Sequence, residues 1–217
     1  MAVVVVPAVA WSWYLPNHRS DLKAGERYGI DVSRHQKAID WERVADDGID
    51  FAYIKASEGG DLVDIRFAQN WEGAGDVGLD RGAYHYFTLC RPGAEQAANF
   101  LSTVPSDEAE LSPALDLEIA GNCSDRPDEA DVAKEVAAFI GAVEAETGEP
   151  VVLYIGDDWQ ERYPVAGRGE RPRWARRMYR RPLTDDWWIW QCSGTSRVDG
   201  IEGSTDLNVM KGAAPPR

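Results

Sequence analysis

The chain is poor in the residues that bind metal ions and redox cofactors. It has only three cysteines and three histidines among 217 residues. No Cys-x-x-Cys pair occurs, and His18, His35 and His85 are too scattered to show metal-ligand spacing. Zinc sites usually carry such clustered ligands. The sequence therefore predicts neither a metal site nor a cofactor.

Positive charge is also scarce. Lysine and arginine number 23 against 37 acidic residues, which gives a net charge of −14. Proteins that bind nucleic acids depend on basic surface, so we expect no nucleic-acid partner. The balance is uneven, however, because residues 162–181 hold eight arginines and one glutamate, a local charge of +7.

Long apolar runs are absent except at the start. Residues 2–15 are apolar over 14 positions, whereas a membrane-spanning helix needs about 20. This length suits the core of a secretory signal, and Ala8-Val9-Ala10 resembles a cleavage site, although no basic segment precedes it. We expect residues 1–15 to be an export signal or the remnant of a membrane anchor, which predicts an extracellular or cell-surface protein. The alternatives are a start that lies upstream and a packed or frayed terminus.

The rest of the chain shows a regular alternation of strand and helix patterns. After a polar linker at 16–27, short apolar runs predict strands at 28–33, 51–57, 81–87, 112–118 and 150–156. Segments with helical spacing or a short helical pattern follow each run, at 39–48, 66–78, 93–104, 128–147 and 157–162. Three further strands are expected around Trp174, at 187–193 and at 204–210, without long helices between them. Five βα units and three strands predict an α/β fold, a modified TIM-like barrel over residues 28–213 with a tail at 214–217.

Four acidic residues lie where the predicted strands end. They are Asp31, Asp116, Glu118 and Asp206. Active sites of such barrels form at the carboxyl ends of the strands. Asp116 and Glu118 are two residues apart, so they share one face of a strand at a backbone separation of about 6.6 Å. Their mutual repulsion and burial should raise one pKa, as glycoside hydrolysis requires. The nine tryptophans and eight tyrosines suit a carbohydrate cleft.

Seven motifs in series resemble one known family. They are YGIDVSRHQ with IDW, FAYIKASEG, RGAYHYF, PALDLE, VVLYIG, WIWQCS and TDLN. Their order and spacing over residues 28–211 resemble glycoside hydrolase family 25, lysozymes that cleave peptidoglycan between N-acetylmuramic acid and N-acetylglucosamine. The family fold is a modified barrel of five βα units and three further strands, as the pattern above predicts independently.

The resemblance assigns roles to individual residues. It implies that Glu118 is the general acid, that Asp116 is its assisting carboxylate, and that Asp31 and Asp206 flank them. Residues expected to bind substrate are Tyr86, Tyr154, Gln191, Trp174 and Trp188. For the aromatic members, the alternative is a role in packing the barrel. The implied partner is bacterial cell-wall peptidoglycan. Separately, we expect the protein to be a monomer.

The three cysteines are expected to form one disulfide and leave one thiol. Cys90 and Cys123 each lie in a loop beyond an apolar strand, so they can be bridged if those strands are neighbours. The resemblance implies the same disulfide, which some exported members have. Cys192 follows the apolar run WWIWQ and is expected to be buried.

Several alternatives stay open. The chain resembles a muramidase, but a related barrel hydrolase acting on chitin-type glycan and a non-catalytic glycan-binding barrel remain possible readings of the same residues. An amidase would usually need a metal site or a Cys/His pair, and the sequence shows neither pattern. The arginine-rich stretch departs from the family pattern, and it is either a solvated loop or a contact for anionic wall polymers or muramyl peptide carboxylates. The sequence does not decide between a substrate-assisted and a direct mechanism.

Overall fold

The computed structural model describes residues 17–105, 108–164 and 171–212. The predicted export segment, residues 1–15, and the predicted tail, residues 214–217, lie outside this part of the chain. The barrel begins at Glu26, two residues inside the predicted linker. The linker also contacts the rest of the fold, because the Arg19 guanidinium pairs with the Asp47 carboxylate and the Tyr28 hydroxyl donates to the Ser20 carbonyl.

One sheet contains every strand of the described residues. The strands are β1 (Glu26–Val32), β2 (Phe51–Glu58), β3 (Leu62–Val63), β4 (Asp80–Tyr86), β5 (Ala114–Leu117), β6 (Val152–Ile155), β7 (Arg173–Arg176), β8 (Ile189–Ser196) and β9 (Thr205–Lys211). The order is β1-β9-β8-β7-β6-β5-β4-β2-β3, and a further β1–β2 pairing closes eight strands into a barrel, with β3 added to β2. This confirms the predicted modified TIM-like barrel.

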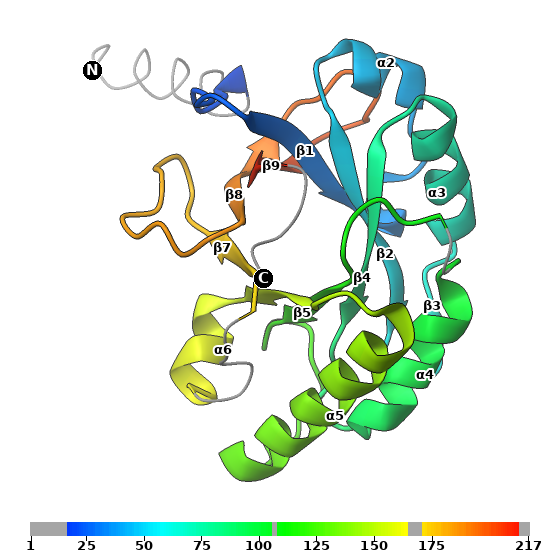
Figure 1. Cartoon of the computed structure of the whole chain (residues 1–217), viewed down its shortest axis with the longest axis vertical. Helices are drawn as coiled ribbons and strands as arrows, with labels where there is room; N and C mark the ends of the chain where they lie inside the picture. The colour runs from blue at the N-terminus through cyan, green and yellow to red at the C-terminus, as the bar shows by residue number, and fades with distance from the viewer. Residues whose placement is uncertain (1–16, 106–107, 165–170, 213–217) are drawn as a thin grey trace, which may run out of the picture.

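The helices cover one side of this barrel (Figure 1). They are η1 (Arg34–Gln36), α2 (Trp41–Asp46), α3 (Phe67–Asp76), α4 (Gly93–Thr103), α5 (Glu129–Thr147) and α6 (Asp157–Arg162). Loops connect β7, β8 and β9, as the sequence predicts. Strands β1, β2 and β4 to β8 run parallel, whereas β9 is antiparallel to both of its neighbours, β1 and β8.

Helix α5 shows how the sequence pattern becomes packing. Its buried side chains recur at steps of three and four residues, and they are Val132, Val136, Phe139, Ile140 and Val143. Such spacing places apolar side chains on one face of a helix. Gly148 ends the helix in a left-handed conformation, with φ of 71°, which glycine adopts without a steric penalty.

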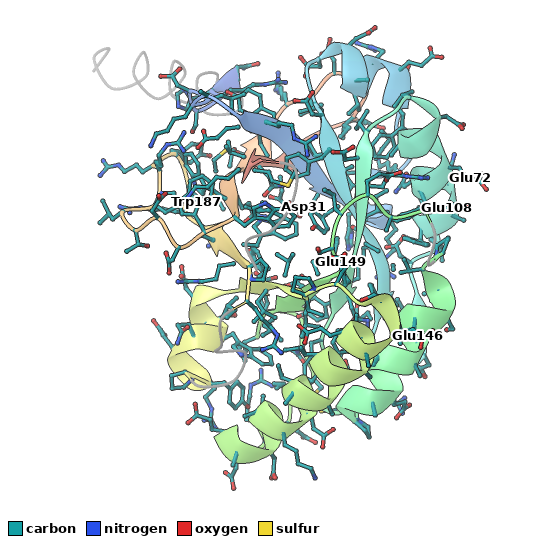
Figure 2. All side chains as sticks on the ribbon, in the orientation of Figure 1. Asp31, Glu72, Glu108, Glu146, Glu149 and Trp187 are labelled. Atoms are coloured by element: carbon teal, nitrogen blue, oxygen red, sulfur yellow. A yellow bond between two sulfur atoms is a disulfide. The ribbon has the colours of Figure 1, made fainter. Side chains whose placement is uncertain are left out.

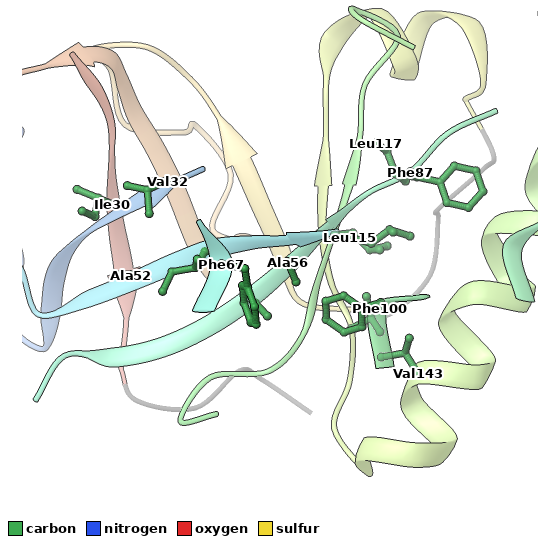
Figure 3. Close-up of a cluster of buried hydrophobic side chains, with 14 of the residues drawn as sticks. Ile30, Val32, Ala52, Ala56, Phe67, Phe87, Phe100, Leu115, Leu117 and Val143 are labelled. Atoms are coloured by element: carbon green, nitrogen blue, oxygen red, sulfur yellow. The ribbon is translucent and has the colours of Figure 1, made fainter. Parts of the chain in front are cut away.

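Two apolar clusters lie on the two sides of the strands. The larger one fills the space between the barrel and its helices, and in Figure 3 Phe100 and Val143 lie near Leu115. The smaller one fills the barrel interior, with Phe51, Tyr53 and Trp188 among its members. The barrel interior is therefore a packed core.

The cysteines are arranged as predicted. Cys90 and Cys123 form a disulfide that joins the loop after β4 to the loop after β5. These two strands are neighbours in the barrel, which is the condition that the sequence left open. Cys192 is free and buried, and burial raises the pKa of its thiol to about 11. In the described ranges, the helices are too short or too polar to cross a membrane.

Candidate active site

A pocket of about 450 Å³ opens at the carboxyl ends of the parallel strands. All four predicted acidic residues line it: Asp31, Asp116, Glu118 and Asp206. Figure 2 places Asp31 among the strands, whereas Glu72 and Glu146 lie at the outer edge of the molecule. Most acidic side chains of this protein lie elsewhere, but the fold brings these four carboxyl groups into one cavity.

Asp206 reaches this pocket by a route that the sequence pattern missed. It is the second residue of β9, not a residue late in its strand. Because β9 runs antiparallel, its first residues lie beside the last residues of β1, and Asp206 pairs with Asp31 in the register of the two strands. The expectation that all four acids lie late in their strands is therefore wrong for Asp206, although Asp206 lines the pocket together with the other three.

Asp31 and Asp206 are the first acid pair of the pocket, since they lie opposite each other on β1 and β9. Asp31 Oδ2 accepts hydrogen bonds from Asn208 Nδ2 at 2.7 Å and from Gln191 Nε2 at 3.3 Å. Burial raises the pKa of Asp31, and these donors oppose the rise. Burial, the negative charge of Asp31 and a hydrogen bond with Asp31 raise the pKa of Asp206 to about 8. Asp206 therefore keeps its proton at neutral pH, and the hydrogen bonds that Asp31 accepts favour the ionised form of Asp31.

Asp116 and Glu118 are the second acid pair. Asp116 lies within β5 and Glu118 directly follows it. Burial first, and then the charges of Glu118 and Asp31, raise the pKa of Asp116 well above its ordinary value. Asp116 Oδ1 is buried and has no hydrogen-bond partner in the described protein. A buried polar atom without a partner is costly, so its retention beside the pocket calls for a functional explanation.

Glu118 is held in a setting that keeps its proton. Burial and the charge of Asp158 raise its pKa, whereas a hydrogen bond from Tyr154 lowers it. The Tyr154 hydroxyl lies 3.3 Å from Glu118 Oε1 and 3.2 Å from Gln191 Oε1. Gln191 contacts Asp31 in turn, so Tyr154 and Gln191 connect the two acid pairs across the pocket.

The expected sugar-binding residues divide into two groups. Tyr86, Tyr154, Trp174 and Gln191 line the pocket. Trp188 does not line it, and its side chain is 2% exposed within the interior apolar cluster. Trp188 precedes the first residue of β8, at the end of this parallel strand opposite the pocket. Trp188 therefore packs the barrel interior, which is the alternative role expected for the aromatic residues, and it does not reach this pocket.

Two of the pocket aromatics are committed to the protein's own hydrogen bonds. The Tyr86 hydroxyl donates to the Ala120 carbonyl at 2.7 Å, and Trp174 Nε1 donates to Asn208 Oδ1 at 2.8 Å. Their rings are therefore fixed, and what they can offer a sugar is mainly apolar surface. Lys55 Nζ lies 4.8 Å from the centre of the Tyr86 ring and 2.6 Å from Glu58 Oε2.

Sequence reasoning missed two residues that support these acids. Asn208 is fully buried beneath the pocket, where it links Asp31 to Trp174. It lies two residues after Asp206, so the period-two rule for strands would have placed it on the same face. Asp158 sits in α6, after a different strand from Glu118, and no local pattern connects the two.

The arrangement supports acid-base chemistry without a metal ligand set. In the described part of the chain, no group of three or more His, Cys, Asp and Glu side chains is positioned to hold a metal ion. The pocket instead offers protonated and ionised carboxyl groups side by side. Such a setting can protonate a leaving oxygen and stabilise a developing positive charge at a sugar carbon.

Comparison with known proteins gives consistent matches over most of the chain. The sequence model of the family described as Glycosyl hydrolases family 25 matches residues 30–201. Protein YegX of Escherichia coli O157:H7, described as uncharacterized, is 42% identical over 193 residues, which are 85% of this chain and 70% of that protein. Lysozyme M1 of Streptomyces globisporus is 32% identical over 203 residues, 86% of this chain and 68% of that protein. The solved structure of a family 25 glycosyl hydrolase from Bacillus anthracis matches with a TM-score of 0.80 and 32% identity, over 90% of this chain and 94% of that one.

Proposed function

Since the chain belongs to glycosyl hydrolases family 25, we propose that it hydrolyses the β-1,4 bond between N-acetylmuramic acid and N-acetylglucosamine in peptidoglycan. The observation that carries this proposal is the pair of carboxyl groups that β5 delivers into a pocket with two further acids. Relatives whose names describe lysozymes or a muramidase support the same substrate. Such a substrate implies that the protein acts on the cell wall, outside the cytoplasm.

Glu118 is the general acid in this proposal. Its raised pKa lets the carboxyl group keep its proton to a higher pH than an exposed glutamate would. As the glycosidic bond breaks, this proton passes to the leaving oxygen of N-acetylglucosamine. Tyr154 holds the Glu118 carboxyl group in place through its hydroxyl.

Asp116 is the assisting carboxylate. In the substrate-assisted route, the N-acetyl oxygen of the muramic acid attacks the anomeric carbon while the bond to the leaving oxygen breaks. The unpartnered Asp116 Oδ1 accepts the N–H of that acetamido group, and the ionised form of Asp116 stabilises the positive charge of the cyclic intermediate. Water then opens this intermediate, with Glu118 taking up the proton, and the product retains its anomeric configuration. Inversion in the first-formed product would refute this route in favour of a water attack assisted by Asp116 or Asp206.

The remaining pocket residues recognise the sugar. Tyr86 and Trp174 offer apolar ring surface, and Gln191 offers an amide. Arg176, at the end of β7, also lines the pocket, and its side chain is 42% exposed. Its guanidinium lies 3.9 Å from the well-exposed Asp157 carboxylate, a weak pairing that leaves it free to meet a substrate anion such as the lactyl or peptide carboxylate.

The decisive experiment identifies the bond that is cut. Purified peptidoglycan is digested, the released muropeptides are analysed by mass spectrometry, and the sugar at the new reducing end is determined. N-acetylmuramic acid at that end supports the proposal, whereas N-acetylglucosamine refutes it. Chitin oligomers tested in parallel separate a muramidase from a hydrolase of chitin-type glycan. Wall binding without any new reducing ends would instead favour a non-catalytic glycan-binding barrel.

A variant pair tests the role of Glu118. We expect Glu118→Gln to reduce turnover by at least about 100-fold, the scale of a lost general acid, with an unchanged thermal transition. The matched control is Glu146→Gln, since Glu146 is exposed on the outer face of α5. Wild-type turnover in Glu118→Gln would refute the assignment.

A further inference from the structure

The turn that follows Glu118 is held by a side chain from the next βα unit. Asp158 Oδ2 accepts the main-chain N–H groups of Ile119 at 3.2 Å and of Ala120 at 3.0 Å. Its other oxygen, Oδ1, accepts the N–H of Trp159 at 2.7 Å. A carboxylate with three N–H donors is well satisfied in its ionised form. A fixed negative charge therefore stands beside the residue that follows the proposed acid.

Gly156 shows how closely the two side chains approach. Its amide donates to the Leu117 carbonyl at 2.9 Å, which joins the end of β6 to the end of β5. A Cβ atom at this position would lie 2.8 Å from Asp158 Oδ1 and 3.2 Å from Glu118 Cγ. The side chains of Asp158 and Glu118 thus both lie against the main chain at Gly156, where there is no side chain to separate them.

Other contacts hold the carbonyl groups of the same turn. Asn122 Nδ2 donates to the Glu118 carbonyl at 2.9 Å, and the Tyr86 hydroxyl donates to the Ala120 carbonyl at 2.7 Å. Asn122 and Tyr86 are neutral hydrogen-bond partners, whereas Asp158 adds a charge. Asp158 is therefore the member of this set that can affect both the position and the proton affinity of Glu118.

We propose that Asp158 is a positioning residue for Glu118, which fixes the main chain that carries the acid and keeps a negative charge beside its carboxyl group. This inference rests on the proposed function, because it concerns the residue proposed there as the general acid. Asp158 contacts the turn after Glu118 and does not line the pocket, so it acts through Glu118.

The charge of Asp158 is one of several influences on the pKa of Glu118. Burial is the main cause of the raised pKa of Glu118, and Asp158 is the next. The other titratable and charged groups around it are Asp31 on β1, Tyr86 on β4, Asp116 on β5, Tyr154 on β6, Arg176 on β7 and Asp206 on β9. Tyr154 and Arg176 lower the pKa of Glu118, and Asp31 raises it. Loss of the Asp158 charge should thus lower this pKa.

Two substitutions separate the charge from the hydrogen bonds. Asp158→Asn removes the charge and keeps an oxygen for the N–H groups of Ile119 and Ala120. Asp158→Ala removes both. Asp131→Asn is the control, because Asp131 is an exposed aspartate in the first turn of α5 and does not line the pocket. The pH dependence of kcat/KM and of kcat is measured on a soluble oligosaccharide of alternating N-acetylglucosamine and N-acetylmuramic acid, with thermal unfolding recorded for each variant.

The basic limb of the kcat/KM profile reports the protonated acid. We expect it to move to lower pH by about half a unit in Asp158→Asn, the shift that two charges about 6 Å apart produce in a water-like medium. Asp158→Ala should show the same shift and a further loss in kcat of about tenfold, because the turn is no longer held. Asp131→Asn should match the wild type.

The outcomes distinguish this inference from the proposed function. A folded Asp158→Asn whose profile coincides with that of the wild type overturns the inference, as does an Asp158→Ala with wild-type kcat. If Asp158→Ala fails to fold, the pH profile of Asp158→Asn still decides. Failure of the wild-type protein to cleave the oligosaccharide would refute the proposed function itself, before any variant is compared.

Discussion

Gly156 offers a direct steric test of the site, because a side chain at this position would meet both Asp158 and the proposed acid, Glu118. Its φ of −65° and ψ of 152° are values that alanine adopts without strain. In Gly156→Ala the new methyl group would lie 2.8 Å from Asp158 Oδ1, 3.2 Å from Glu118 Cγ and 3.4 Å from the Leu117 carbonyl oxygen. The substitution therefore perturbs the position of Glu118 while the main chain keeps its conformation.

The size of the effect follows from these distances. Non-bonded carbon atoms pack best at about 3.5–4.0 Å, so Glu118 and Asp158 must each recede by several tenths of an ångström. A misplacement of about 1 Å can reduce an enzymatic rate by about 100-fold. For roughly half that displacement we expect kcat to fall by about tenfold. Overpacking should also lower stability, by about 1 kcal/mol.

Gly141→Ala is the matched control for this experiment. Gly141 lies in α5, and a Cβ atom there would have no neighbour within 4 Å. Alanine is the better helix former by about 1 kcal/mol, so this variant should melt about 2–4 °C higher with unchanged kcat. Both variants are assayed on purified peptidoglycan and by calorimetry. Wild-type kcat in Gly156→Ala, or an equal loss in Gly141→Ala, would refute the geometry argued for Glu118.

Two further predictions concern the charges of the site. Tyr154→Phe removes a hydrogen bond that lowers the pKa of Glu118, so the basic limb of the kcat/KM profile should move to higher pH, and a shift to lower pH would contradict this. Asp116→Asn should be inactive but more stable than the wild type at pH 7.5, by on the order of 1–2 kcal/mol. Burial and neighbouring charges raise the folded-state pKa of Asp116 above its ordinary value of 3.8. The stabilising effect of its protonated form is therefore complete below pH 3.8 and is lost as the pH rises towards the folded-state pKa. Urea unfolding at pH 4 and pH 7.5 should show the gain of the variant mainly at pH 7.5, and a gain confined to pH 4 would refute it.

The barrel could be predicted from the sequence because its elements are locally encoded. The apolar face of α5 and the five alternating βα units appear as spacing in the chain, and the structure has them where they are expected. Parallel pairing then brings the ends of distant strands together, which places Asp31 and Asp116 in one pocket. The direction of β9 could not be predicted in this way, because no pattern within Thr205–Lys211 indicates whether the strand runs parallel or antiparallel to its neighbours.

The aromatic residues show the limit of such patterns. Trp174 lies in β7 and Trp188 directly precedes β8, and both side chains are buried, at 4% and 2% exposure. Only Trp174 reaches the pocket, because it lies within the last three residues of β7 while Trp188 precedes β8. The two tryptophans therefore differ in their position along the barrel axis. Sequence spacing reports which face of a strand a side chain occupies, but this position depends on the stagger of all neighbouring strands.

The arginine-rich stretch shows why local charge sums mislead. Arg171 forms a two-bond pair with Glu144 of α5, at 2.8 and 2.9 Å, and Arg181 forms one with Glu26 of β1, at 2.6 and 2.9 Å. These acids lie 27 and 155 residues away in the chain, so no window of sequence could have matched them. Much of the local +7 is therefore neutralised by the fold instead of forming a free basic surface. The expected contact with an anionic wall group narrows to Arg176, the arginine of the described part of this stretch that lines the pocket.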